Sequence, residues 1–153
     1  MKTYFKIPII AGLISIIVLI IITPFYSLFS LPPRNGTLKV KGLINKVNVY
    51  YDNHGRAHVF AKNLHDLVFT QGYLTAQDRL FQMDLTRRAA KGELSEIIGK
   101  SGLTRDKFVR DLGIIQSANE ELKKSNRQTL TILKYYSEGI TAYIYKNKHK
   151  KQQ

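Results

Sequence analysis

The sequence predicts an α+β protein in which an N-terminal transmembrane helix precedes a β-hairpin and several helices. Residues 7–33 carry no charged side chain, residues 47–51 alternate between apolar and polar side chains, and residues 66–85 carry apolar residues at steps of three and four. A helix that crosses a bilayer needs about 20 apolar residues. Alternation is typical of a half-buried strand, and steps of three and four are typical of a helix.

Length and composition limit the protein to a small unit without cysteine chemistry. The chain has 153 residues and no cysteine, so one compact domain is expected. The absence of cysteine excludes disulfides, thiolate catalysis and zinc sites made of cysteines.

The N-terminal apolar segment is interpreted as an uncleaved signal anchor over residues 7–30. Lys2 and Lys6 form a short basic region before it, so a cleaved signal peptide is the competing interpretation. No small-x-small cleavage site is found near residues 27–30, and the apolar run exceeds a usual signal-peptide core. A buried core helix is the third alternative, but a helix apolar all round is unusual in a small soluble domain.

The formal net charge of +13 permits anionic partners but does not indicate a nucleic-acid-binding protein. The basic residues are scattered through the predicted helices, and no nucleic-acid motif is present. No nucleic-acid partner is therefore expected, whereas attraction to anionic lipid or wall polymer is more plausible.

A β-hairpin is predicted after the apolar segment. Val47, Val49 and Tyr51 alternate with polar or exposed positions in residues 42–51, and an extended pattern resumes at residues 57–61. The turn formers between them are Asp52, Asn53, His54 and Gly55.

A long helix beginning near Asp66 is predicted to be sandwiched between other elements. It carries two apolar stripes, and a helix that is apolar on two faces should not lie on a surface. Gly72 inside it costs about 1 kcal/mol relative to Ala, which is tolerated where another backbone comes close. The two stripes are Phe69, Tyr73, Ala76, Leu80 and Met83, and Leu67, Leu74, Phe81 and Leu85.

Shorter helices are expected in the second half of the chain. Glycines punctuate residues 92–102, which should form short helical turns. Thr104 is predicted to cap a short helix that ends at Gly113, and a capping box from Ser125 to Gln128 is predicted to start the last helix. The tyrosines of that last helix are interpreted as packing surface.

The hairpin and the long helix together resemble the N-terminal signature of the penicillin amidase (penicillin acylase) family. The hairpin matches V-x-x-D-x-x-G-x-P-H-I-x-A with Ala57 in place of the proline, and the helix matches G-Y-x-x-A-Q-D-R-L-x-Q-M-D. Looser D-x-x-x-R-x-L-G and Y-x-x-G-x-x-A-Y elements follow, so the resemblance covers nearly all of residues 43–145. The polar and glycine positions singled out as the structural family motif are Asp52, Gly55, His58, Gly72, Gln77, Asp78, Arg79, Gln82, Asp84, Arg87, Arg88 and Gly92.

The resemblance implies part of an αββα N-terminal-nucleophile hydrolase that cleaves acyl amides. In such enzymes a serine exposed by autoproteolysis is the nucleophile, and its own amine is the base. The resemblance places that serine, the oxyanion donors, the calcium ligands and most of the acyl pocket outside this chain. No catalytic, substrate-binding or metal-binding residue and no cofactor is therefore expected here, with calcium expected only in the complete enzyme.

The motif residues are interpreted as scaffold rather than as a reaction centre. Asp84 precedes Arg88 by four residues, the orientation that favours a helical ion pair. Asp78 and Arg79, on a helix with two apolar stripes, should be partly buried and paired. The rival interpretation, a general acid and base, has no adjacent nucleophile in the sequence.

Other apparent sites do not survive inspection. His54 and His58 lie four residues apart across a turn without an obvious third metal ligand. Residues 99–101 mimic the end of a P-loop, but Leu94 stands where its first glycine belongs. The sequence has no G-x-S-x-G elbow.

Two hypotheses follow for function. In the first, the chain is the N-terminal fragment or subunit of a membrane-anchored penicillin-amidase-like hydrolase, inactive without its catalytic chain. In the second, it is a non-catalytic membrane-anchored remnant or partner-binding module. The resemblance implies an exported domain, so a single-pass cell-membrane location with the soluble part outside is expected, although the flanking lysines alone favour the reverse orientation. The expected organisation is a cytoplasmic region at 1–6, a signal anchor at 7–30, a linker at 31–41, the N-terminal portion of a penicillin-amidase-like domain at 42–146 and a basic tail at 147–153.

Overall fold

The computed structural model describes residues 12–23 and 35–148. The chain divides into two compact units, Met1–Gly36 and Thr37–Gln153. The predicted region at 1–6, both ends of the predicted anchor, residues 31–34 of the predicted linker and residues 149–153 of the predicted tail lie outside the described residues.

The predicted fold class is wrong in its N-terminal transmembrane helix. Residues 12–23 are described as helix. Within the described ranges, no helix is both long and apolar enough to cross a membrane. The α+β description is also corrected, because the described chain is mostly helical and its one sheet has two strands.

The predicted hairpin is confirmed. Strands β1 (Asn48–Tyr51) and β2 (Ala57–Phe60) pair antiparallel, with Val49 opposite Val59. Gly55 turns the chain at a φ of 75°, a left-handed conformation that glycine adopts without steric cost. The alternation also holds, because Val49 and Tyr51 are half-buried while Tyr50 is exposed.

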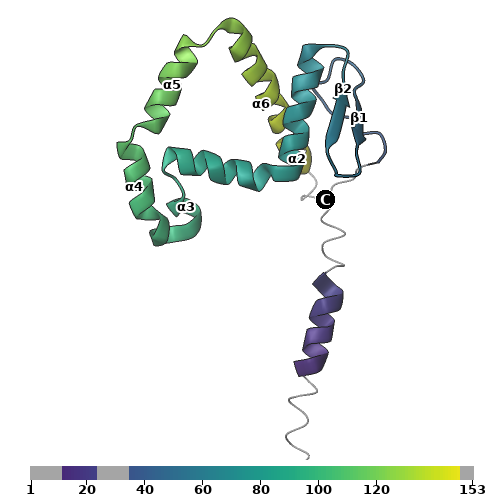
Figure 1. Ribbon diagram of the computed structural model, residues 1–153, viewed down its shortest axis with the longest axis vertical. Helices are drawn as coiled ribbons and strands as arrows, with labels where there is room; N and C mark the ends of the chain where they lie inside the picture. Colours follow the sequence, from purple (N-terminus) through teal and green to yellow (C-terminus); the bar gives the residue numbers. More distant parts are fainter. Residues whose placement is uncertain (1–11, 24–34, 149–153) are drawn as a thin grey trace, which may run out of the picture. The chain divides into compact units, whose positions relative to one another are not determined.

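The long helix α2 runs from Leu64 to Lys91 and is bent at Arg79. Asn63 caps its start by accepting a hydrogen bond from the backbone N–H of Asp66, and the left-handed Gly92 ends it. Arg79 leaves helical geometry, with φ −140° and ψ 21°. Figure 1 shows the result, two helical segments that meet at an angle.

The fully buried residues of α2 all lie in its first half. Phe69, Tyr73 and Ala76 are buried where this half packs against α6 (Arg127–Lys148). On the second predicted stripe, Leu67 is 39% exposed and Phe81 is 70% exposed. The prediction that α2 is apolar on two buried faces is therefore wrong for the chain as it stands.

Two glycines allow α2 and α6 to cross at backbone contact. A Cβ on Gly72 would lie 2.1 Å from the carbonyl oxygen of Tyr136, and a Cβ on Gly139 would lie 1.9 Å from that of Phe69. Both distances are too short for any side chain. The prediction that Gly72 marks a close backbone approach is confirmed.

Short helices connect α2 to α6. They are α3 (Ser95–Ile98), the 3-10 helix η1 (Gly99–Gly102), α4 (Leu103–Asp111) and α5 (Ile114–Lys124). The short turns predicted between glycines are present, but α4 begins before Thr104 and has no side-chain cap, so the predicted cap is wrong. Gly113 follows α4 in a left-handed conformation, as a helix end requires, and α5 then begins at once.

The capping box predicted for the last helix is wrong by one residue. The Asn126 side-chain oxygen accepts a hydrogen bond from the backbone N–H of Thr129 at 2.8 Å, so Asn126 caps α6. The Ser125 hydroxyl instead donates to the carbonyl of Glu121 at 2.9 Å and closes α5. The predicted packing role holds for two tyrosines, Tyr135 and Tyr143, which contact aromatic rings of α2.

Candidate functional site

The hairpin turn is organised around the carboxylate of Asp52. One of its oxygens accepts hydrogen bonds from the backbone N–H groups of His54 and Arg56, each at 2.9 Å. The other accepts from the Arg56 guanidinium at 2.9 Å and lies 3.5 Å from Nε2 of His58. These bonds, led by the backbone bond from Arg56, lower the pKa of Asp52 below its ordinary value. Asp52, Gly55 and His58 thus stabilise the turn.

The histidines of this hairpin do not form a metal centre with their neighbours. His58 is exposed and contacts the single carboxylate of Asp52. In residues 12–23 and 35–148, no three His, Asp or Glu side chains gather where a metal ion could be held.

A fully buried carboxylate, Asp66, fastens the start of α2 to the segment before the hairpin. Its two oxygens accept hydrogen bonds at 2.8 Å from the backbone N–H groups of Ile44 and Asn45. Asn63 donates a further bond at 2.7 Å. Burial raises the pKa of Asp66, but these bonds and the contact with His65 outweigh it, so its pKa lies well below the ordinary value.

Asp66 was predicted only to lie near the start of the long helix, with no role of its own. The available signal was the spacing of Asn63 and Asp66, which is that of a helix cap followed three residues later by an acidic side chain. The structure contains the cap, because Asn63 accepts from the backbone N–H of Asp66 at 2.7 Å, while the Asp66 carboxylate accepts from the side-chain amide of Asn63 rather than from its backbone. What the spacing could not show is the contact with residues 44–45.

His65 joins the two long helices beside this carboxylate. Its Nδ1 lies 3.1 Å from an oxygen of Asp66, and its Nε2 lies 3.5 Å from an oxygen of Glu138 on α6. The ring stacks on Phe69 at 5.9 Å and meets Tyr135 edge-on at 4.5 Å. The crossing of α2 and α6 is therefore held by polar and aromatic contacts as well as by its glycines.

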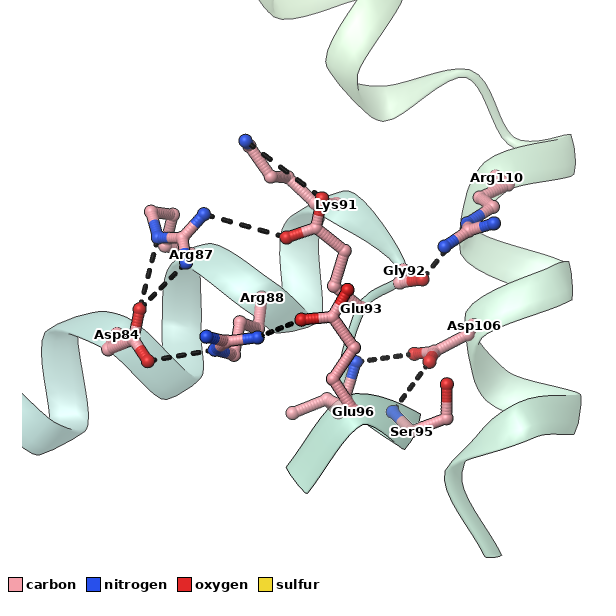
Figure 2. Close-up of polar contacts among 11 residues, drawn as sticks. Asp84, Arg87, Arg88, Lys91, Gly92, Glu93, Ser95, Glu96, Asp106 and Arg110 are labelled. Atoms are coloured by element: carbon pink, nitrogen blue, oxygen red, sulfur yellow. Dashed lines mark hydrogen bonds and ion pairs between the residues drawn. The ribbon is translucent and has the colours of Figure 1, made fainter. Parts of the chain in front are cut away.

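The second half of α2 carries an ion-pair network that Figure 2 shows in detail. Asp84 accepts from Nη2 of Arg87 at 2.8 Å and from Nε of Arg88 at 2.8 Å. Arg88 also pairs with Glu96, and Arg87 lies 3.5 Å from Glu93. The bonds from Arg88 and Arg87 lower the pKa of Asp84. The predicted Asp84–Arg88 ion pair is confirmed.

The end of α2 is joined to α4 by a second carboxylate, Asp106. Its two oxygens accept from the backbone N–H groups of Leu94 at 3.0 Å and Ser95 at 2.7 Å. Figure 2 shows Asp106 beside Ser95. Arg110, one turn later, donates through Nε to the carbonyl of Gly92 at 2.9 Å. Burial raises the pKa of Asp106, but the hydrogen bonds from Ser95 and Leu94 outweigh it and leave the pKa lowered.

Four motif side chains at the bend of α2 are not used inside this chain. Asp78, Arg79 and Gln82 are exposed and Gln77 is half-buried. Across residues 35–148, no hydrogen bond or ion pair is formed by any of these four side chains. The prediction that Asp78 and Arg79 are partly buried and paired is therefore wrong.

A shallow cavity of about 270 Å³ lies where the end of α2 meets α4 and α5. Its lining combines apolar Ala90, Val109 and Ile115 with charged Lys91, Glu93 and Arg110. Its lining residues include no serine, threonine or cysteine.

The chain belongs to the penicillin amidase family. The family profile, Penicillin amidase, matches residues 46–152, which include the hairpin, the bent helix and the network of Figure 2. The chain is 32% identical over 121 residues to the acyl-homoserine lactone acylase QuiP of Pseudomonas aeruginosa, a match that covers 79% of this chain and 14% of that protein. It is 35% identical over 115 residues to the penicillin acylase 2 proenzyme of a Pseudomonas species, covering 75% of this chain and 15% of the proenzyme.

A solved structure supports the same assignment. The fold is similar to that of the thermostable penicillin G acylase from Alcaligenes faecalis, with a TM-score of 0.63 and 29% identity. That match covers 72% of this chain and 58% of the acylase chain. The chain spans about a seventh of the length of the curated relatives it matches.

Proposed function

We propose that this chain is the N-terminal portion of an acyl amide hydrolase of the penicillin amidase type and is inactive without the rest of that enzyme. The family assignment supports the hydrolase class. The proposed inactivity is supported by the roles of four carboxylates. Each of them accepts hydrogen bonds that stabilise the fold: Asp52, Asp66, Asp84 and Asp106.

The reaction of the complete enzyme would be hydrolysis of a linear acyl amide to a carboxylate and an amine. Both kinds of relative named above carry the word acylase, one for penicillins and one for acyl-homoserine lactones. Each of those substrates has a side-chain acyl group joined to nitrogen, so the acyl amide is the shared chemistry. If calcium has a part in that enzyme, its ligands would come from the remaining polypeptide.

The remaining polypeptide is the partner that this proposal requires. A curated relative is about seven times as long as the segment matched here, so most of the enzyme's mass would lie in that partner. A non-catalytic binding module is the second candidate, favoured by the motif side chains that have no role inside the chain.

Hydrolysis assays with and without a completing polypeptide test both candidates. The full 153-residue chain is assayed alone and after co-expression with the part of the Pseudomonas penicillin acylase 2 proenzyme that lies beyond the matched segment. Release of free amine from penicillin G and from an N-acyl-homoserine lactone is followed. We expect release only from the pair. Binding without release favours the module, and release by the lone chain overturns the proposal.

A further inference from the structure

The cavity where α2 ends against α4 and α5 combines an apolar lining with cationic side chains. Each of the three helices contributes one apolar residue, of which Val109 is buried while Ala90 and Ile115 are half-buried. Lys91 and Arg110 line the same cavity and are exposed. Small-molecule sites usually have this composition, an apolar lining with a few charged or polar groups that orient the ligand.

The charged groups of this cavity carry an excess of positive charge. Its lining holds two cations, Lys91 and Arg110, against the single carboxylate of Glu93. That carboxylate is shared, because its oxygens lie 4.0 Å from Nζ of Lys91 and 3.5 Å from Nη1 of Arg87. Arg110 forms no ion pair with any residue in the part of the chain that the structure describes. The cavity therefore favours an anionic ligand.

The Arg110 side chain is fixed in position by a single hydrogen bond. Its Nε donates to the carbonyl of Gly92 at 2.9 Å, and Figure 2 shows this bond linking α4 to the end of α2. Within residues 35–148, its terminal amino groups, Nη1 and Nη2, donate to no other group. A guanidinium that is already oriented and keeps unused N–H groups can bind a carboxylate through two parallel hydrogen bonds.

We propose that this cavity binds a small monocarboxylate with an apolar tail. The carboxylate pairs with the terminal amino groups of Arg110, and the tail covers the apolar lining around Val109. The cavity volume of about 270 Å³ equals that of about nine waters at roughly 30 Å³ each, which suits a short-chain acid such as hexanoate. The inference goes beyond the proposed function and does not depend on it, because every group of the site belongs to this chain.

Titration of the full 153-residue chain with four small probes tests the chemistry of the site. The dissociation constants of hexanoate, acetate, inorganic phosphate and hexylammonium are measured by NMR. We expect hexanoate to bind at least about tenfold more tightly than each of the others, because only hexanoate has both a carboxylate and an apolar tail. The proposal is overturned if hexanoate shows no saturable binding, or if another probe binds as tightly.

Two arginines of α4 provide a matched pair of variants. Arg110→Gln removes the proposed carboxylate partner, and Arg105→Gln removes the same charge from an exposed position outside the cavity lining. We expect Arg110→Gln to weaken hexanoate binding by about tenfold or more, as loss of a charge-assisted hydrogen bond does. Arg105→Gln should change it by less than about twofold, because solvent screens a charge outside the cavity. Equal effects of the two variants would overturn the proposal.

A variant of the apolar lining covers the case in which Arg110→Gln fails to fold, since Arg110 also bonds to Gly92. Ile115→Gln places a polar group beside the proposed tail and leaves Arg110 unchanged. We expect it to weaken hexanoate binding by about tenfold, because the tail loses apolar contact. Unaltered hexanoate affinity in a folded Ile115→Gln chain would show that the tail does not lie in this cavity.

Discussion

At the scale of single residues, buried carboxylates stabilise the fold in this chain. In many other hydrolases, buried carboxylates take part in catalysis instead. Asp66 and Asp106 are both buried and each accepts two backbone N–H bonds from a neighbouring segment. Asp106 also accepts a side-chain hydrogen bond from Ser95, which helps to lower its pKa. The role of Asp66 and Asp106 is to join segments that local sequence does not join.

Replacing Asp66 by Asn should destabilise the fold by about 2 kcal/mol. The amide offers one acceptor oxygen where the carboxylate offers two, so the N–H of Ile44 or Asn45 would face an NH₂ group and lose its partner. The free energy of unfolding in urea measures the effect. Asp78→Asn is the matched control, because Asp78 is exposed and should change stability by less than about 0.5 kcal/mol. Equal effects for both variants would contradict the role given to Asp66.

Asp66 also predicts how stability depends on pH. Its pKa is lower in the folded chain than the ordinary 3.8, so the folded state favours the ionised form. The resulting stabilisation is complete above the unfolded pKa and is lost as pH falls through it towards the folded pKa. We expect the thermal midpoint to fall below about pH 4, and to fall less steeply in Asp66→Asn. Identical acid profiles for the two proteins would rule out Asp66 as a source.

At the scale of elements, the crossing of α2 and α6 depends on two residues without side chains. Gly72→Ala or Gly139→Ala would place a methyl group against a backbone carbonyl of the other helix. We expect each change to lower the free energy of unfolding by about 3 kcal/mol, because overpacking against backbone cannot be relieved by a side-chain rotation. Gly12→Ala is the control, since nothing lies within 4 Å of its added Cβ. Unchanged stability of both crossing variants would show that the helices are free to separate.

The elements that local patterns encode were predictable from sequence. The hairpin follows from its alternation and turn residues, and the Asp84–Arg88 pair follows from helical spacing. The cap of α6 could not be predicted from local spacing, because Ser125 and Asn126 are both good caps. The choice between them depends on α5, which was not among the predicted helices. The bend at Arg79 could not be predicted either, because no proline or glycine stands at that position.

The candidate site divides in the same way. Residues whose partners lie within a turn or two, such as Asp52 and Asp84, were assigned correctly as scaffold contacts. Asp78 and Arg79 were expected to be buried because α2 has two apolar stripes. Leu67 and Phe81 of the second stripe are exposed here. The apolar periodicity therefore shows what the helix can bury, but not what covers it.

At the scale of the whole molecule, large apolar side chains remain exposed on more than one element of the unit formed by residues 37–153. Tyr50 and Phe60 pair edge-to-face on the hairpin while each stays 61% exposed, and Phe81 is 70% exposed on α2. The two-stranded sheet also has no further strand among the described residues. Exposed apolar surface and open strand edges favour association.

The full chain alone should therefore bind a hydrophobic dye and self-associate as its concentration rises. The completing part of the Pseudomonas penicillin acylase 2 proenzyme should suppress both, because it would cover the same side chains. Dye fluorescence and sedimentation velocity measure the two effects. The double variant Phe60→Ser and Phe81→Ser should reduce dye binding by about half or more, because dye binding is expected to scale with exposed aromatic area. The control is Lys107→Ser, a change at an exposed position of α4, which should leave dye binding unaltered. A lone chain that stays monomeric and binds no dye would mean that the unit is complete without a partner, against the view that these surfaces belong to a larger hydrolase.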